Sequence, residues 1–417
     1  MFEAGDLCTA LYDLARKHNG ENREVVVNGI PILIIQRFED ADYILRLNAD
    51  NYIKNMAWFR QVMGPSRMSE NGEAWQLRME ISQPYFSKFD RNACFAFAQE
   101  AAQDTIQEMA QASTAGATVL NDIHLRKLSA TVALRLFFGM SIDEAGLDLE
   151  DLAEMMEYGS QYAFVPRGET NERYQQTISK LPALRHRVLK SLEKFRTIQA
   201  DPNTMLADLQ AAQRDKTNGF TQEHELVTLF AASTETTGAS LGWACYLLAK
   251  YPDIQQLIRN EVRALRGAGQ FDWEHIKNLR PLQNFISETL RLYPPTPVIA
   301  KLAVADDMIN GIPIKAHQNI LVSFVGIQMD QRMRRDPWQM DISDTYAACP
   351  VSGRTTSFSM GPRICGGKHF ALVELAAFIC TFVERAELEL TSDAPPHFLW
   401  KSQMLHKGGQ PVRISTL

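Results

Sequence analysis

The sequence predicts a mainly α-helical protein with a small β-rich corner, folded as one domain over residues 1–417. Apolar residues recur at intervals of three and four over most of the chain, as they do on the buried faces of helices. Strand-like runs are confined to three short stretches, near residues 23–36, 301–323 and 387–417. Proline and glycine are scattered and no internal repeat is present, so the sequence offers no domain boundary.

The first predicted element is a β-hairpin. The runs REVVV and IPILIIQ are rich in Val and Ile, and they are joined by Asn28-Gly29, a dipeptide typical of tight hairpin turns. Helices follow, and their apolar spacing covers residues 93–112, 122–139, 183–198, 223–250, 253–266 and 366–386. The two later strand stretches are expected to form a small sheet that flanks the helices.

Composition excludes several classes of protein. With 45% hydrophobic and 22% charged residues, the chain is ordinary for a globular protein with a sizeable core. The net charge of -6 argues against a nucleic-acid partner. The six cysteines lie far apart, without a C-x-x-C pair, which indicates free thiols in a reducing compartment. No apolar run is long enough for a signal peptide or a membrane span, so we expect a cytoplasmic protein without a transmembrane anchor.

The most informative stretch is FSMGPRICGGKHFA, residues 358–371, which a predicted helix follows directly. A lone cysteine at a helix start is usually a small buried residue. Here the surrounding residues change that interpretation, because aromatic, glycine, arginine and alanine positions keep a fixed spacing around Cys365. A thiolate that binds a metal needs tight backbone turns and N–H groups directed at the sulfur.

This spacing resembles the cysteine-ligand loop of the cytochrome P450 family, F-x-x-G-x-R-x-C-x-G-x-x-x-A, with every position filled. The resemblance implies the cytochrome P450 fold and iron protoporphyrin IX (haem b), with Cys365 as the axial ligand of the iron. It implies that Phe358 shields the sulfur and that Gly361 and Gly367 let the chain turn beneath the porphyrin. Arg363 would pair with a haem propionate. A thiolate ligand favours cleavage of the O–O bond.

The long predicted helix at 223–250 carries an unusual polar centre, Ala-Ser-Thr-Glu-Thr-Thr, and we expect the helix to loosen there. It is similar to the family's oxygen-activating motif, [AG]-G-x-[DE]-T-[TS]. The likeness places Ala232 beside the haem, Ser233 at a position that usually holds Gly or Ala, and Glu235 and Thr236 at the acid and alcohol positions. The implied role of that pair is proton delivery to O2. The alternative is a structural helix whose hydroxyls bond back to carbonyl oxygens.

Glu288 and Arg291 lie one helical turn apart and resemble the buried Glu-Arg pair of the family, so we assign them a structural role. The family adds a third arginine from a later segment. Arg335 and Arg354 are the candidates here.

Further haem contacts follow from the same resemblance. The segment 72–86 looks like the helix that binds a propionate through W-x-x-x-R, but Trp75 is followed by Arg78 at three residues, with Met79 at the usual position. We predict Trp75 and Arg78 as haem contacts, with an exposed arginine as the alternative. Lys301 lies where the family often supplies another base for a propionate.

The resemblance implies a monooxygenase that inserts one atom of O2 into a hydrophobic small molecule, such as a fatty acid, terpenoid or other natural-product intermediate. Arg60 or Arg67 would anchor a carboxylate. The predicted apolar lining comprises Trp58, Phe59, Val62, Met63, Val298 and Ile299. The alternatives are a peroxide-driven peroxygenase and a haem-binding sensor or carrier without turnover.

Electrons would come from a separate ferredoxin or flavodoxin with its reductase, because the resemblance leaves no room for a redox module. A solvated charged surface is the alternative for the basic face that such a partner would use. The candidate basic residues are Arg332, Arg334, Arg335, Lys368 and His369.

Overall fold

The computed structural model describes residues 6–27, 30–114, 122–164, 172–215, 219–343 and 356–417, and it is mainly helical with small sheets, as predicted. The helices are α1 (Leu7–His18), α2 (Phe38–Asp42), α3 (Ala57–Met63), α4 (Gly72–Ser87), α5 (Arg91–Thr114), α6 (Asp122–Ala133), α7 (Ile142–Ala145), α8 (Leu149–Phe164), α9 (Glu172–Leu192), α10 (Met205–Arg214), α11 (Gln222–Lys250), α12 (Pro252–Gly267), α13 (Trp273–Ile276), α14 (Arg280–Leu292), α15 (Phe324–Gln328) and α16 (Lys368–Arg385). The strands are β1 (Arg23–Val27), β2 (Ile30–Ile35), β3 (Tyr52–Lys54), β4 (Val298–Ala303), β5 (Asp307–Ile309), β6 (Ile312–Ile314), β7 (Asn319–Ser323), β8 (Ala386–Leu390), β9 (Phe398–Lys401), β10 (Gln403–His406) and β11 (Val412–Thr416).

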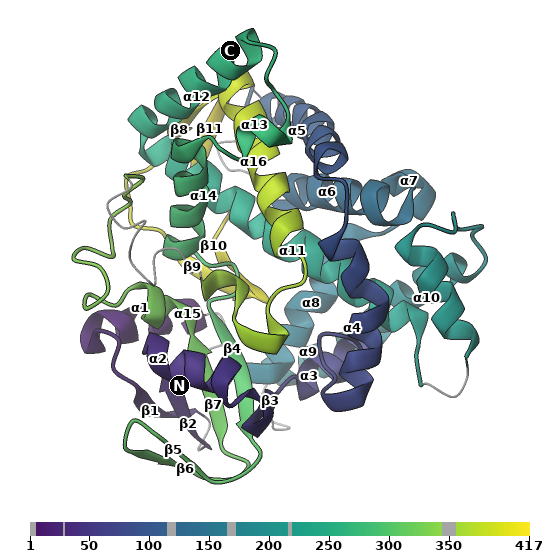
Figure 1. Cartoon of the computed structure of the whole chain (residues 1–417), viewed down its shortest axis with the longest axis vertical. Helices are drawn as coiled ribbons and strands as arrows, with labels where there is room; N and C mark the ends of the chain where they lie inside the picture. The colour runs from purple at the N-terminus through teal and green to yellow at the C-terminus, as the bar shows by residue number, and fades with distance from the viewer. Residues whose placement is uncertain (1–5, 28–29, 115–121, 165–171, 216–218, 344–355) are drawn as a thin grey trace.

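A five-stranded sheet forms the β-rich corner at one end of the molecule, in the lower part of Figure 1. Its strand order is β1-β2-β7-β4-β3, with β2 and β7 parallel and the other neighbours antiparallel. Strands from both ends of the chain therefore meet in one sheet. The predicted hairpin is confirmed in its strands, while its turn at Asn28-Gly29 lies outside the described residues.

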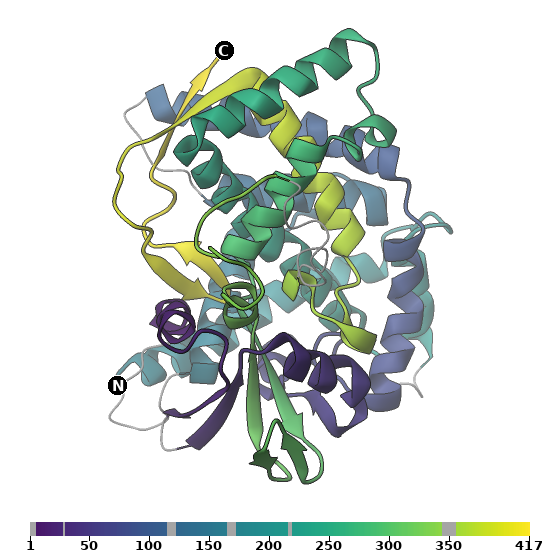
Figure 2. The same ribbon diagram turned by 60° about the vertical axis from the view of Figure 1, so that its left-hand side comes forward.

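Three short two-stranded ladders pair β5 with β6, β8 with β11, and β9 with β10. The last two account for the strand character predicted at 387–417, and Figure 2 shows them along the edge of the helical mass, at the C-terminal end of the chain. The third strand stretch thus adds small ladders of its own instead of extending the main sheet.

Helix α11 forms the centre of the helical part and packs against α6 and α16 (Figure 1). It is buried along most of its length, because its sequence is apolar on nearly every side. Trp243, which is fully buried, donates from its indole Nε1 to the backbone oxygen of Met404 at 2.9 Å. This contact joins the C-terminal ladder to the central helix.

The expected loosening in the middle of this helix is wrong, because α11 is continuous from Gln222 to Lys250. The hydroxyls of Thr234 and Thr236 donate to the carbonyl oxygens of Phe230 and Ala232, each at 2.7 Å. These bonds satisfy the hydroxyls within the helix and leave its backbone pattern intact.

Among the described residues, no helix combines the length and the apolar character that a membrane span requires.

Candidate active site

A cavity of about 1590 Å³, which includes its opening to solvent, lies between α4, α11, β4 and the loop that precedes α16. The sequence brings these elements together because the polar centre of α11 and the cysteine loop face each other across it. The predicted site residues in its wall are Trp75, Ala232, Thr236, Lys301, Phe358, Arg363, Cys365 and Gly367. The motifs that were identified separately in the sequence therefore form one site.

The cysteine loop directs its thiol into this cavity. Of the five cysteines that the structure describes, Cys365 is exposed and the other four are buried. The backbone N–H of Cys365 donates to the carbonyl oxygen of Phe358 at 2.9 Å, which closes the loop. Burial raises the pKa of the Cys365 thiol, while the Gly367 N–H and nearby cations, among them Lys54, act against that rise. The helix start after Gly367 adds a partial positive charge near the sulfur.

Gly361 does not line the cavity, but it makes the loop possible. Its φ of +69° lies in the region that favours glycine, and a Cβ there would lie 2.0 Å from the carbonyl oxygen of Leu45. The prediction that this glycine permits a tight turn matches the geometry. Its place is against the backbone of residues 45–46.

Three cations line the cavity without a carboxylate partner among the described residues. Lys301 Nζ donates to Tyr52 O at 2.8 Å, and Arg363 donates to Glu70 O at 2.9 Å and lies 4.5 Å from the centre of the Trp75 ring. Lys54 Nζ donates to Met68 O at 3.3 Å. Burial, followed by Arg363, lowers the pKa of Lys54 to about 7 and that of Lys301 to about 8. Such a cluster fits a ligand with two acidic groups, as haem has in its propionates.

Arg78 takes no part in that cluster. It is 3% exposed, forms an ion pair with Glu225 at 3.0 Å, and donates to Ala74 O and Gly219 O. The shortened interval after Trp75 turns the guanidinium toward the start of α11, so the structure does not support Arg78 as a propionate ligand. It offers Lys54 instead, which the sequence could not single out because its cavity neighbours Lys301 and Arg363 lie about 250 and 300 residues away.

The polar centre of α11 divides between the cavity and the neighbouring helix. Ala232, Ser233 and Thr236 line the cavity, so the sequence placed these three correctly. Glu235 does not line it. Its carboxylate is 2% exposed and accepts from Arg126 Nε of α6 at 3.0 Å. The predicted acid therefore lies behind the alcohol, in an ion pair that the sequence did not reveal.

The Glu288-Arg291 pair has its third partner in Arg334. Arg291 and Arg334 each bind both carboxylate oxygens of Glu288, at 2.7 and 2.9 Å. The expectation of Arg335 is wrong because that side chain is exposed, and Arg354 lies outside the described residues. Arg334 is also removed from the predicted basic face, since it is 8% exposed.

The predicted substrate lining is confirmed in part. Ile299 and Arg67 line the cavity. The other predicted apolar residues are absent from its described wall, and Phe59, Val62, Met63 and Val298 are buried in the core. Arg60 points outward and pairs with Glu70 at 2.9 Å, so it does not reach the site.

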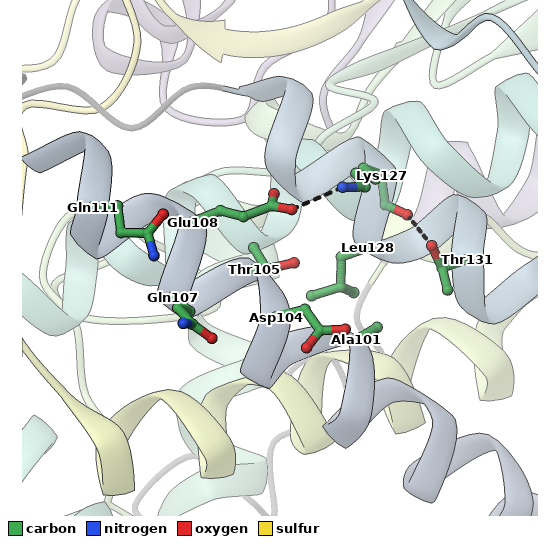
Figure 3. A pocket seen from close by; sticks show the side chains of 9 residues that line it. All are labelled: Ala101, Asp104, Thr105, Gln107, Glu108, Gln111, Lys127, Leu128 and Thr131. Atoms are coloured by element: carbon green, nitrogen blue, oxygen red, sulfur yellow. Dashed lines mark hydrogen bonds and ion pairs between the residues drawn. The ribbon is translucent and has the colours of Figure 1, made fainter. Parts of the chain in front are cut away.

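A second hollow lies between α5 and α6 (Figure 3). Polar side chains form most of its wall, and Lys127 Nζ binds Glu108 Oε1 across it at 2.8 Å. It shares no lining residue with the cavity of Cys365. Nothing in its wall matches the chemistry of the cysteine loop.

Comparison with known proteins agrees with this geometry. The family model described as "Cytochrome P450" matches residues 5–413. The chain is 31% identical over 202 residues to carotene epsilon-monooxygenase, chloroplastic, of Arabidopsis thaliana, which covers 46% of this chain and 37% of that protein. It is 23% identical over 378 residues to cytochrome P450 monooxygenase pvhE of Talaromyces variabilis, which covers 79% and 69%. Human aromatase is 29% identical over 161 residues, which covers 38% and 31%.

The matched part of the chain therefore spans about a third of the length of two of these relatives. Among solved structures, the heme domain of cytochrome P450DA superposes with a TM-score of 0.80 at 16% identity, over 99% of this chain and 94% of that one. The mainly helical fold with a β-rich corner is thus the fold of that domain. From the match over residues 5–413, we conclude that this chain belongs to the cytochrome P450 family.

Proposed function

We propose that the chain is a haem-thiolate monooxygenase that converts a hydrophobic substrate, O2, two electrons and two protons into an oxygenated product and water. The observation that carries the proposal is that the Cys365 thiol and the Thr236 hydroxyl line one cavity, whose cations match the propionates of haem b. The haem, when bound, supplies the iron at which O2 is reduced. Cys365 would hold the iron, and Lys54, Lys301 and Arg363 the propionates.

The residues of α11 would supply protons. Thr236 Oγ1 lines the cavity, and its bond to Ala232 O fixes the hydroxyl's orientation. Glu235 lies next to it in sequence but pairs with Arg126. A proton from Glu235 would reach Thr236 only after this ion pair opens, so Arg126 would hold the acid until protons are needed.

The substrate is proposed to be a largely apolar molecule such as a fatty acid or a terpenoid. The cavity wall includes Leu229, Leu290, Ile299 and Phe324, which favour apolar ligands by burial. Carotene, in the name of one relative, is a compound of the terpenoid class. Arg67, the one candidate carboxylate anchor that lines the cavity, would bind the acid group of a fatty acid.

A separate ferredoxin or flavodoxin with its reductase would supply the electrons. Lys368 and His369 follow the cysteine loop directly, and Arg91 acts electrostatically on His369, so positive charge gathers beside the thiolate. An acidic redox protein would dock there. We place the activity in one domain over residues 1–417 and in the cytoplasm, where the free thiols of the described cysteines stay reduced.

The first test is optical. Protein reconstituted with haem, reduced and exposed to carbon monoxide should show the strongly red-shifted Soret band of thiolate ligation, and Cys365→Ala should lose it. The substitution Cys245→Ala, at a buried cysteine of α11, is the matched control and should keep the band. Absence of the band from the wild type would overturn thiolate ligation.

The second test measures turnover with lauric acid, limonene and testosterone. NADPH with a surrogate ferredoxin and its reductase should give product from at least one of them, with O2 consumed. Product from hydrogen peroxide alone at an equal rate would indicate the peroxygenase instead. Haem binding without product from either oxidant would indicate a sensor or carrier.

A further inference from the structure

A second buried carboxyl group lies behind the cavity wall. Glu374 of α16 is 0% exposed, at the junction where α6, α11 and α16 meet. Among the described residues, the groups that hydrogen-bond to it are the hydroxyls of Ser129 and Thr237, and no cation acts on it. Burial raises the pKa of Glu374 well above its usual range. A buried carboxyl without a cation is stable in its neutral, protonated form.

The hydrogen-bond geometry gives the same answer independently. Ser129 Oγ lies 3.0 Å from the backbone oxygen of Ser233 and 3.0 Å from Glu374 Oε1. Ser129 has one hydroxyl hydrogen, which it donates either to the carbonyl or to Glu374. A neutral Glu374 satisfies both contacts, because its O–H donates to Ser129 Oγ while Ser129 donates to Ser233 O.

The other oxygen of Glu374 connects the acid to the cavity. Thr237 Oγ1 lies 3.4 Å from Glu374 Oε2, and Thr237 is also part of the cavity wall, next to Thr236. One hydroxyl group thus stands between a protonated carboxyl and the space in which O2 would be reduced. Glu235, the acid named by the sequence motif, lacks such a link, since it is paired with Arg126 and does not line the cavity.

We infer that Glu374 holds a proton for oxygen reduction and passes it to the cavity through the hydroxyl of Thr237. This inference rests on the proposed monooxygenase function. In the step, Thr237 gives its hydroxyl proton to an oxygen atom in the cavity and takes the proton of Glu374. The ionised Glu374 is then stabilised when Ser129 turns its hydrogen from Ser233 O to Oε1. The reverse transfer from the cavity restores the neutral acid, so atoms and charge balance.

The test uses Glu374→Gln, which keeps the size and hydrogen-bonding capacity of the side chain but has no acidic proton. Glu384→Gln removes a carboxylate from the same helix, where it pairs with Arg266 away from the cavity, and is the matched control. In the infrared spectrum near neutral pH, the wild type and Glu384→Gln should show the deuterium-sensitive C=O stretch of a protonated carboxyl group. Glu374→Gln should lack it, and a wild type without this band would overturn the inference.

Turnover is then compared with two oxidants, using whichever of lauric acid, limonene and testosterone changes the Soret band most. With O2 and a ferredoxin system, Glu374→Gln should make about tenfold less product per electron, less than the usual contribution of a positioned acid because Glu235 remains. With hydrogen peroxide, which brings both protons, it should match the wild type. Thr237→Val should behave in the same way.

The outcomes separate the two proposals. If the wild type makes product with both oxidants while Glu374→Gln yields as much product per electron from O2, Glu374 has no proton-holding role. If Glu374→Gln loses activity equally with both oxidants, its role is structural and the inference is again overturned. If the wild type makes no product with either oxidant, the proposed function itself fails, and the inference fails with it.

Discussion

Arg334 and Glu288 form a two-pronged ion pair, with Arg334 Nη1 and Nη2 at 2.7 and 2.9 Å from the two carboxylate oxygens. Both side chains are 8% exposed. The same carboxylate accepts from Arg291 and from the backbone N–H of Asp341. The pair joins α14 to the segment after α15, which leads toward the cysteine loop.

Replacing Arg334 with Met should lower the free energy of unfolding by about 3–5 kcal/mol, because it breaks a buried ion pair by removing one partner. Thermal unfolding of the cofactor-free protein would measure this. Arg335→Met is the matched control, since its side chain is exposed, and should stay within about 0.5 kcal/mol of the wild type. Equal effects of the two substitutions would contradict the assignment of Arg334.

Lys54 should make the stability of the cofactor-free protein depend on pH. Its pKa falls from the usual 10.5 to about 7 in the folded chain, through burial and then the charge of Arg363. Between about pH 7 and pH 10.5 the unfolded chain binds a proton that the folded chain has lost. The contribution of Lys54 to the free energy of unfolding therefore rises with pH across this window.

Lys54→Met removes the cost of burying that charge. The variant should be more stable than the wild type at pH 6, and this advantage should shrink as the pH rises toward 10. Urea unfolding at a series of pH values would measure the difference. The exposed Lys17→Met is the control, and a gap of constant size for Lys54→Met would show that the buried ammonium is not the cause.

Gly361→Ala should disrupt the cysteine loop more than a positive φ alone requires. Alanine at φ +69° costs about 1–2 kcal/mol, and its Cβ would in addition lie 2.0 Å from the backbone oxygen of Leu45. Gly72→Ala is the control, because Gly72 has φ +57° and no atom lies within 4 Å of the position that its Cβ would take. The melting temperature and the haem retained after gel filtration should fall clearly further for Gly361→Ala.

The sequence predicted those parts of the site that lie in continuous motifs. The spacing around Cys365 and the polar centre with Thr236 each fit within one turn or loop, so their order in the chain determines their geometry. Arg334 could not be chosen from three nearby arginines, because burial there depends on how the segment crosses α14. Glu374 was covered by a correctly predicted helix, but its hydroxyl partners come from α6 and α11, and only the packing of three helices brings them together.

Thr236→Val should separate electron consumption from product formation. The substitution keeps the shape of the side chain and removes the one hydroxyl of the predicted acid-alcohol pair that lines the cavity. Protons would then reach reduced oxygen more slowly, so hydrogen peroxide should accumulate while NADPH consumption continues, and product per NADPH should fall about tenfold or more. Thr234→Val is the matched control, because the Thr234 hydroxyl makes the same bond within α11 but lies outside the cavity wall. If both variants keep the wild-type ratio of product to NADPH, the hydroxyl of Thr236 takes no part in proton delivery.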